Sequence, residues 1–204
     1  MTSSPFSTKE RILDAAEQLF ARHGFAGASL RQVTSRAGVN LAAVNYHFGS
    51  KEKLHEEVFR RRLDILNQRR REALDALRAD ATLEDVLTAF IHPALALSRE
   101  TDGGDAFVRI MARAYAEHDA RLREFLSANY GDVLKRFAAE LAARLPALDK
   151  PELYWRLDIV TGALTYAMAN FGITRRREDI NEEQHRIDAE RHLVQFAAAG
   201  LRST

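Results

Sequence analysis

The 204-residue chain is long enough for one large domain or for a small domain joined to a medium one. Its 30 Lys and Arg residues nearly balance its 29 Asp and Glu residues, so any surface that binds a polyanion must be a local patch. The absence of cysteine excludes disulfides, thiolate metal sites and a cysteine nucleophile. No apolar run approaches the roughly 20 residues of a membrane span. The N-terminus carries no apolar signal-peptide core, so we expect a cytoplasmic protein.

The chain begins with a predicted amphipathic helix. Apolar side chains recur at helical spacing between residues 12 and 20. We expect Thr8 to cap the start of this helix and Gly24 to end it.

Two shorter helices follow, joined by a tight turn. Ser29 is the expected cap of the first and Asn40 of the second, and Gly38 closes the first because a Cβ would be crowded there. Two helices joined in this way form a helix-turn-helix, which places its second helix in the major groove of DNA. The residues predicted to face inward are Val33, Ala37, Val39 and Val44. The residues predicted on the outer face of the second helix are Leu41, Ala42, Asn45, Tyr46 and His47.

The rest of the chain keeps a helical pattern, and no segment alternates as a strand would. A long charged helix is predicted to begin near Lys51, and amphipathic stripes recur between residues 83 and 141. Two last helices are predicted over residues 152–171 and about 183–201. We therefore expect an all-α protein of about nine helices.

Two features of this helical region have more than one interpretation. Pro93 falls within an amphipathic stripe, where it either kinks the helix, which could shape a pocket, or ends it. The arginines at residues 60–62 and 69–71 could help to bind DNA. Three consecutive residues on a helix point in three directions, however, so we expect these arginines to be solvated charges.

No catalytic or metal-binding motif stands out. The seven histidines include no HxxxH pair, and the segment from Leu54 to Glu57 does not match HExxH. The GxSxG, P-loop and GxGxxG motifs are absent. We therefore expect neither an enzyme nor a metal or cofactor site.

The segment over residues 24–54 resembles the TetR/AcrR family of regulators. The residues that carry the resemblance are Gly24-Phe25, Ser29, Arg31, Ala37-Gly38-Val39, Tyr46-His47-Phe48, Lys51-Glu52 and Leu54. The resemblance implies a three-helix DNA-binding head over residues 1–53, followed by a helical domain for ligand binding and dimerisation over residues 54–204. Asn45 departs from the pattern, since many members have a tyrosine there. The stretch LAAVNYHFGSK is most similar to the fatty-acid-responsive, PsrA-type branch of the family.

The resemblance also implies which residues contact DNA. Those assigned to bases are Arg31, Leu41, Ala42, Asn45 and Tyr46. Those assigned to phosphates are Ser29, Leu30, His47 and Lys51. An asparagine amide can pair with adenine, and the N–H groups at a helix start suit a phosphate. Arg31 and Asn45 could instead hold phosphates.

Dimerisation is expected at the last two helices. Residues 153–171 and 187–201 are each apolar on more than one face, so each helix must be covered twice. The resemblance implies that the second cover is the same pair of helices in a C2 partner. The expected interface residues are Gly162, Tyr166, Ala169, Leu193, Ala197 and Gly200.

A small apolar ligand is the second expected partner. The helices between residues 82 and 171 carry more large apolar residues than a minimal bundle needs, which favours a cavity, although a filled core fits the same pattern. The branch resemblance implies a long-chain acyl ligand. Arg109 and Arg113 share one helix face, which either points inward to hold a carboxylate or outward to solvent. The candidate ligand residues are Phe90, Phe107, Arg109, Met111, Arg113, Phe137 and Tyr166.

These features together indicate a dimeric regulator that binds a palindromic DNA operator. We expect it to be a repressor that a small apolar ligand releases from this operator. An activator fits the same residues. A helical small-molecule carrier with a vestigial helix-turn-helix, and a helical enzyme, are the alternatives from other classes.

Overall fold

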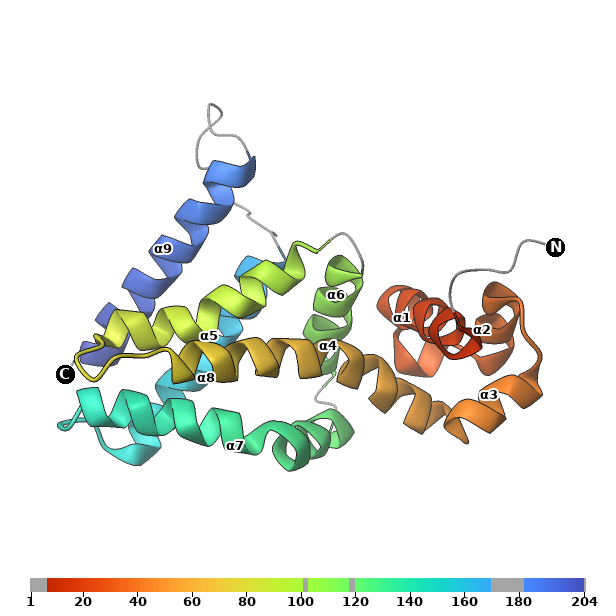
Figure 1. Ribbon diagram of the computed structural model, residues 1–204, viewed down its shortest axis with the longest axis horizontal. Coiled ribbons are helices and arrows are strands. Elements are labelled where there is room, and N and C mark those ends of the chain that lie inside the picture. The colour runs from red at the N-terminus through yellow and green to blue at the C-terminus, as the bar shows by residue number, and fades with distance from the viewer. Residues whose placement is uncertain (1–6, 101–102, 118–119, 170–181, 204) are drawn as a thin grey trace. The chain divides into compact units, whose positions relative to one another are not determined.

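The computed structural model describes residues 7–100, 103–117, 120–169 and 182–203, and most of these residues lie in helices. Within these ranges it contains nine helices and no strand, which confirms the all-α prediction (Figure 1). The helices are α1 (Thr8–Gly27), α2 (Leu30–Ala37), α3 (Leu41–Phe48), α4 (Lys51–Asp75), α5 (Leu83–Ser98), α6 (Gly104–Ala116), α7 (Ala120–Arg144), α8 (Lys150–Met168) and α9 (Glu182–Arg202). Residues 170 and 171, at the end of one predicted helix, lie outside the described residues. None of the helices that are described combines the length and apolarity that a membrane span requires.

The N-cap of the first helix lies one residue earlier than predicted. Ser7, not Thr8, is the N-cap, and its hydroxyl accepts a hydrogen bond from the backbone N–H of Glu10 at 3.2 Å. The Glu10 carboxylate in turn accepts from the N–H of Ser7 at 2.7 Å. These hydrogen bonds hold the pKa of Glu10 below its usual value. A capping box pairs the cap with an acceptor side chain three residues later, which is Glu10 for Ser7 but Arg11 for Thr8.

Gly24 breaks the regular helix, as predicted, but α1 continues to Gly27 beyond the break. The backbone of Gly24 has φ 71° and ψ 173°, which is outside the helical region. A Cβ at this position would lie 2.8 Å from Nη1 of Arg113, which belongs to α6. Glycine therefore both permits the break and leaves room for the Arg113 side chain against α1.

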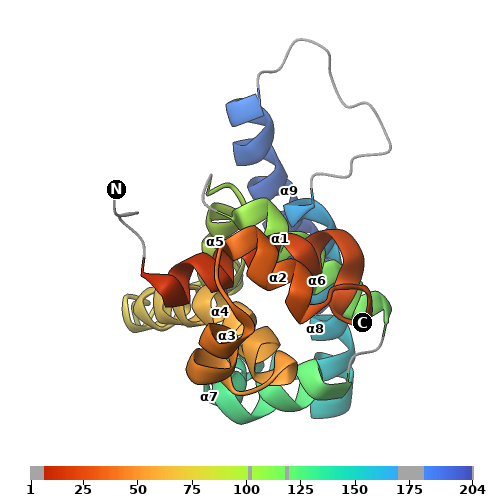
Figure 2. The same ribbon diagram turned by 90° about the vertical axis from the view of Figure 1, so that its right-hand side faces the viewer.

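The chain forms two compact units. Unit 1 comprises Met1–Ile65 and Glu100–Phe125, and unit 2 comprises Leu66–Arg99 and Leu126–Thr204. Unit 1 is larger than the predicted head, because α6 packs on α1 and lies within the same unit. Figures 1 and 2 show α2 and α3 joined by a short turn beside α1.

Two of the arginines predicted to be solvated are buried. In unit 1, Arg62 is 3% exposed and its guanidinium donates two hydrogen bonds to the carboxylate of Glu17, at 2.9 and 3.1 Å. In unit 2, Arg70 lies over the ring of Phe90 at 3.8 Å and donates from Nε to the Phe90 carbonyl. The prediction was wrong for these two because helical periodicity cannot show which neighbouring helix offers an acceptor.

Unit 2 is built around α5, which packs against α8 and α9. Pro93 lies inside this helix and does not end it, because α5 continues to Ser98. A bidentate ion pair ties α5 to α9, with Arg202 donating to Glu84 at 2.8 Å through Nη2 and Oε2. The guanidinium of Arg202 holds the pKa of Glu84 below its usual value.

Candidate nucleic-acid interface

The first helix of the predicted helix-turn-helix is α2, and its cap is the one predicted. The Ser29 hydroxyl accepts from the backbone N–H of Gln32 at 3.3 Å, and the Gln32 side chain accepts from the N–H of Ser29 at 2.8 Å. This reciprocal capping box sets the first turn of α2. Val33 and Ala37 are buried and fasten the helix to its unit.

The turn between the helices depends on Gly38, which has φ 63° and ψ 41°. Its N–H bonds to the carbonyl of Ser35 at 3.3 Å, and the N–H of Val39 bonds to the carbonyl of Thr34 at 3.0 Å. This is a Schellman closure, for which glycine is the favoured residue. Asn40 then caps α3, accepting from the N–H of Ala43 at 2.9 Å. Val39 is half-buried, so it is less enclosed than predicted.

The outer face of α3 is exposed, as its helical spacing predicts. Val44 and Phe48 are buried on the opposite face and anchor the helix. Tyr46 is 86% exposed, and its ring meets the ring of His47 edge to face at 5.1 Å. The other exposed residues of this face are Leu41, Ala42 and Asn45. The face thus offers an amide and apolar groups, which can read base edges in a major groove, and a phenol and an imidazole, which can also bond to phosphates.

The start of α2 is the predicted phosphate site, and the capping box reduces the number of backbone N–H groups that are available there. The N–H of Ser29 already donates to Gln32, so the donors that remain in the first turn are those of Leu30 and Arg31. A helix provides no backbone acceptor for these first N–H groups. Together with the positive end of the helix dipole they suit an anion, and the Arg31 side chain beside them is exposed.

Lys51, the other predicted phosphate residue, stands at the start of α4 on an aromatic support. Its Nζ lies 4.4 Å from the ring centre of Phe25, and the guanidinium of Arg121 lies 5.6 Å from the same centre. Phe25 is itself packed at 4.6 Å against the imidazole of His55. Sequence reasoning used Phe25 only as part of the family motif. It missed this support because Phe25 and Lys51 are far apart in the chain.

A carboxylate accompanies Lys51 in the first turn of α4. Hydrogen bonds from its own backbone N–H and from the Ser50 hydroxyl lower the pKa of Glu52, and the nearby charges of Arg121 and Lys51 lower it further. Glu52 is therefore anionic at neutral pH. Its negative charge offsets part of the positive charge that Lys51 and Arg121 bring to this corner, and these two cations are what would attract a phosphate.

The candidate ligand residues fall in both units. In unit 1, Phe107 and Met111 are buried in the core. Arg109 points outward, where it pairs with Asp105 at 2.7 Å, while Arg113 is half-buried against α1. The two arginines therefore do not point the same way: Arg109 faces solvent and Arg113 contacts α1.

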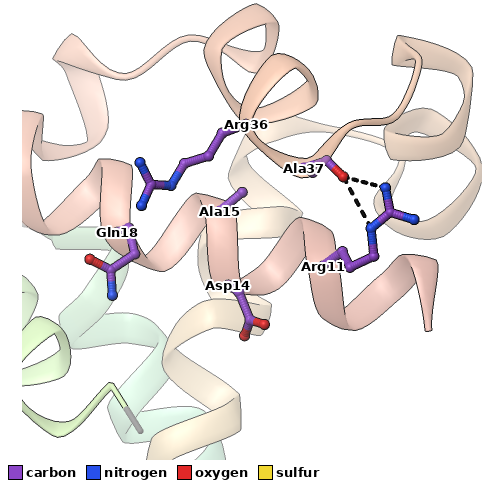
Figure 3. Close-up of a pocket in the computed structure, with 6 residues that line it drawn as sticks. All are labelled: Arg11, Asp14, Ala15, Gln18, Arg36 and Ala37. Atoms are coloured by element: carbon purple, nitrogen blue, oxygen red, sulfur yellow. Dashed lines mark hydrogen bonds between the residues drawn. The ribbon is translucent and has the colours of Figure 1, made fainter. Parts of the chain in front are cut away.

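In unit 2, Phe90 and Phe137 pack edge to face with ring centres 5.0 Å apart. Tyr166 is 42% exposed and lies on a different side of α8 from the buried Leu164. A hollow of about 230 Å³ lies on the surface of unit 1, and none of the predicted ligand residues lines it (Figure 3). Its lining residues are Arg11, Asp14, Ala15, Gln18, Arg36 and Ala37.

The expected dimer residues of unit 2 lie on or beside an exposed apolar face. Gly162, Tyr166, Ala169 and Gly200 are exposed, and Leu193 is half-buried. Ala197 is 2% exposed and contributes to the core of its own unit. Large apolar side chains that sequence reasoning missed complete this face, namely Trp155 (69% exposed), Ile159 (63%) and Phe196 (72%). The spacing of 155, 159, 162 and 166 along one helical face was the signal available for α8.

A capped helix pair with a tight glycine turn and an exposed outer face defines a helix-turn-helix protein of the DNA-binding class. Residues 12–58 match the model for bacterial regulatory proteins of the tetR family, and residues 88–200 match that for the tetracyclin repressor-like C-terminal domain. The chain belongs to the TetR family of transcriptional regulators, which confirms the family prediction.

Individual relatives agree with this assignment. The transcriptional regulator BetI of Vibrio campbellii is 28% identical over 149 residues, which cover 73% of either chain. The transcriptional repressor AcnR of Corynebacterium efficiens is 40% identical over 50 residues, which cover 24% of this chain and 27% of AcnR.

Solved structures share the fold. A transcriptional regulator of Aquifex aeolicus superimposes with a TM-score of 0.63 at 22% identity, covering 95% of this chain and 99% of its own. The fatty acid degradation regulator FadR of Bacillus halodurans superimposes with a TM-score of 0.68 at 17% identity over both complete chains.

Proposed function

We propose that this protein is a cytoplasmic repressor that binds a palindromic DNA operator as a homodimer and leaves it when a small apolar ligand binds. The observation that carries DNA binding is the exposed outer face of α3, held by capped ends and buried anchors. An 86% exposed tyrosine on a short, rigid helix contributes little to the core and is well placed to meet a base.

Selection from a random pool of duplexes tests this directly. Wild type should enrich a palindrome, because each head reads one half-site. Lys51→Ala should weaken binding to every sequence and flatten the dependence of log affinity on log salt by about one unit. Asn45→Ala should relax the preference at one base pair, at a cost of about 1–3 kcal/mol. Lys135→Ala, at an exposed position of unit 2, is the control for loss of one charge.

A chain that selects no duplex yet binds small apolar molecules would be the carrier instead. An activator would select a duplex but raise, rather than lower, transcription of a reporter placed behind it. The two readouts together separate repressor, activator and carrier.

The apolar face of α8 and α9 supports the homodimer. Trp155 of α8 and Phe196 of α9 are each more than two-thirds exposed, the two helices pack against each other, and exposed apolar patches mark association sites. Phe196→Glu should yield a monomer of about 23 kDa by light scattering and lose operator binding at the same time. Leu134→Glu, at an exposed apolar position of α7, should leave the dimer intact. A charge at Ala197 would test folding rather than assembly, because that side chain is buried.

For the ligand we propose a long-chain fatty acid or its CoA ester. The proposal rests on the similarity of LAAVNYHFGSK to the fatty-acid-responsive, PsrA-type branch and on the apolar residues of the second domain. Each buried CH₂ contributes about 0.8 kcal/mol, so release from the operator should strengthen with chain length. Arg113→Ala should raise the concentration needed for release, because Arg113 is the half-buried arginine of the pair. Arg109→Ala should have the smaller effect, because Arg109 is exposed and paired with Asp105. Release by an aromatic or cationic drug, with none by acyl chains of any length, would reject this ligand class.

A further inference from the structure

Arg11 lies on α1, outside the helix-turn-helix, yet its guanidinium reaches the turn between α2 and α3. Its Nε donates to the carbonyl of Ala37 at 3.1 Å, and its Nη2 donates to the same carbonyl at 2.5 Å (Figure 3). Nη2 also donates to the carbonyl of Gly38 at 2.9 Å. One side chain thus bonds to the last residue of α2 and to the first residue of the turn.

The backbone hydrogen bonds that close the turn reach neither of these two carbonyls. The last four carbonyls of a helix have no partner within it. In α2 the Schellman closure supplies donors for Thr34 and Ser35, from the N–H groups of Val39 and Gly38. Arg11 supplies a donor for Ala37 and extends the same arrangement to the carbonyl of Gly38. A cation at this end of a helix also interacts favourably with the helix dipole.

The bond to Gly38 has a directional consequence. The chain leaves α2 at Gly38, in the left-handed region with φ 63°, and α3 starts after the Asn40 cap. The orientation of the peptide that follows Gly38 therefore sets the direction in which α3 departs, and Arg11 fixes the oxygen of that peptide. The backbone of Arg11 is itself fixed in position, because Ile12 and Ala15 of the same helix are buried in the core of unit 1.

We propose that Arg11 is a positioning residue for DNA reading. Its guanidinium fork holds α3 at the angle at which the outer face of that helix fits the major groove. The role requires a fork, because a lysine ammonium at the same reach is a point donor and cannot bond two successive carbonyls in a set geometry. The inference rests on the proposed sequence-specific DNA binding.

The test compares three variants of the full-length protein with wild type. Arg11→Met removes the donors and keeps the apolar stem, Arg11→Lys keeps the charge, and Arg22→Met removes an equal charge from an exposed position of the same helix. Affinity is measured for the duplex that wild type selects and for a scrambled duplex of equal length, at a temperature where circular dichroism shows each variant fully folded. Arg11→Met should lower the ratio of the two affinities about tenfold, which is about 1.4 kcal/mol. Arg11→Lys should give an intermediate ratio, and Arg22→Met should leave the ratio unchanged.

A second readout needs no DNA. Amide hydrogen exchange in α3 should accelerate in Arg11→Met relative to Arg22→Met, because the helix is held less firmly to the turn. If Arg11→Met folds and keeps the wild-type ratio, Arg11 only stabilises the unit and the proposal is overturned. If Arg11→Met does not fold, a wild-type ratio in Arg11→Lys overturns it equally. Failure of wild type to select any duplex would reject the proposed function alone, and the exchange rates would still decide whether Arg11 holds α3.

Discussion

Replacing Glu17 by glutamine removes the negative charge of a buried ion pair in unit 1. The Glu17 carboxylate accepts two hydrogen bonds from Arg62, at 2.9 and 3.1 Å, and both side chains are 4% exposed. The substitution preserves the shape of the side chain but leaves the guanidinium buried beside a neutral amide. Arg61, whose Nη1 lies 3.9 Å from Glu17, loses this acidic neighbour as well and keeps its ion pair with Asp14.

The expected cost follows from this burial. Removing one partner of a buried pair costs about 3–5 kcal/mol, most of it from the charge that is left behind. Arg62→Met should cost a similar amount, because it leaves the Glu17 carboxylate buried without the two hydrogen bonds that Arg62 donates. The double variant loses both charges together, so its cost should be no greater than that of either single variant. The coupling energy of the cycle should therefore be at least as large as one single cost, about 3 kcal/mol or more.

Urea unfolding at pH 7 measures these differences, at one fixed protein concentration because dimerisation contributes to apparent stability. Glu57→Gln is the matched control. It breaks an ion pair between the same two helices, with Lys9 at 3.4 Å, and one within α4, with Arg60 at 3.2 Å. These side chains are all more than about a third exposed, so the loss should cost less than about 1 kcal/mol. A cost for Glu17→Gln no larger than that of Glu57→Gln, or an additive cycle, would refute the argument from burial.

Three further predictions concern single contacts. Gly103→Ala should cost about 1–3 kcal/mol by urea unfolding because of its φ of 80°. The cost should be smaller in the Arg62→Met background, since a Cβ at residue 103 would lie 2.0 Å from Nη2 of Arg62; equal costs would contradict the clash. The melting temperature of Glu84→Gln should approach that of wild type as the pH falls from 7 to below 4.5. Arg202 holds the pKa of Glu84 below 4.5, so this stabilisation is complete above that pH and is lost as the pH falls through the folded pKa; a constant gap would contradict it. Ser29→Ala, which removes a cap, should cost about 1 kcal/mol in thermal unfolding, and a change below about 0.3 kcal/mol would show that the capping box is dispensable.

The helix-turn-helix was predictable from the sequence because its determinants are local. The Ser29 and Asn40 caps and the closure at Gly38 depend on hydrogen bonds between residues a few positions apart, and all three lie where the pattern predicts. Helical periodicity likewise predicts which side of α3 is exposed, since Val44 and Phe48 must both face the core. The cap of α1 is local in the same way, since Glu10 three residues on selects Ser7 rather than the predicted Thr8.

The contacts between helices required the tertiary structure. Periodicity shows that a face is covered but not by what, so it could not show that Arg62 meets Glu17 or that Arg11 reaches Ala37. For the same reason it placed Ala197 on the dimer surface, whereas that side chain is buried in its own unit and the neighbouring Phe196 is exposed. A charged side chain is stable in a protein interior only where another helix presents its partner at hydrogen-bond distance, and that distance is set by how the helices pack.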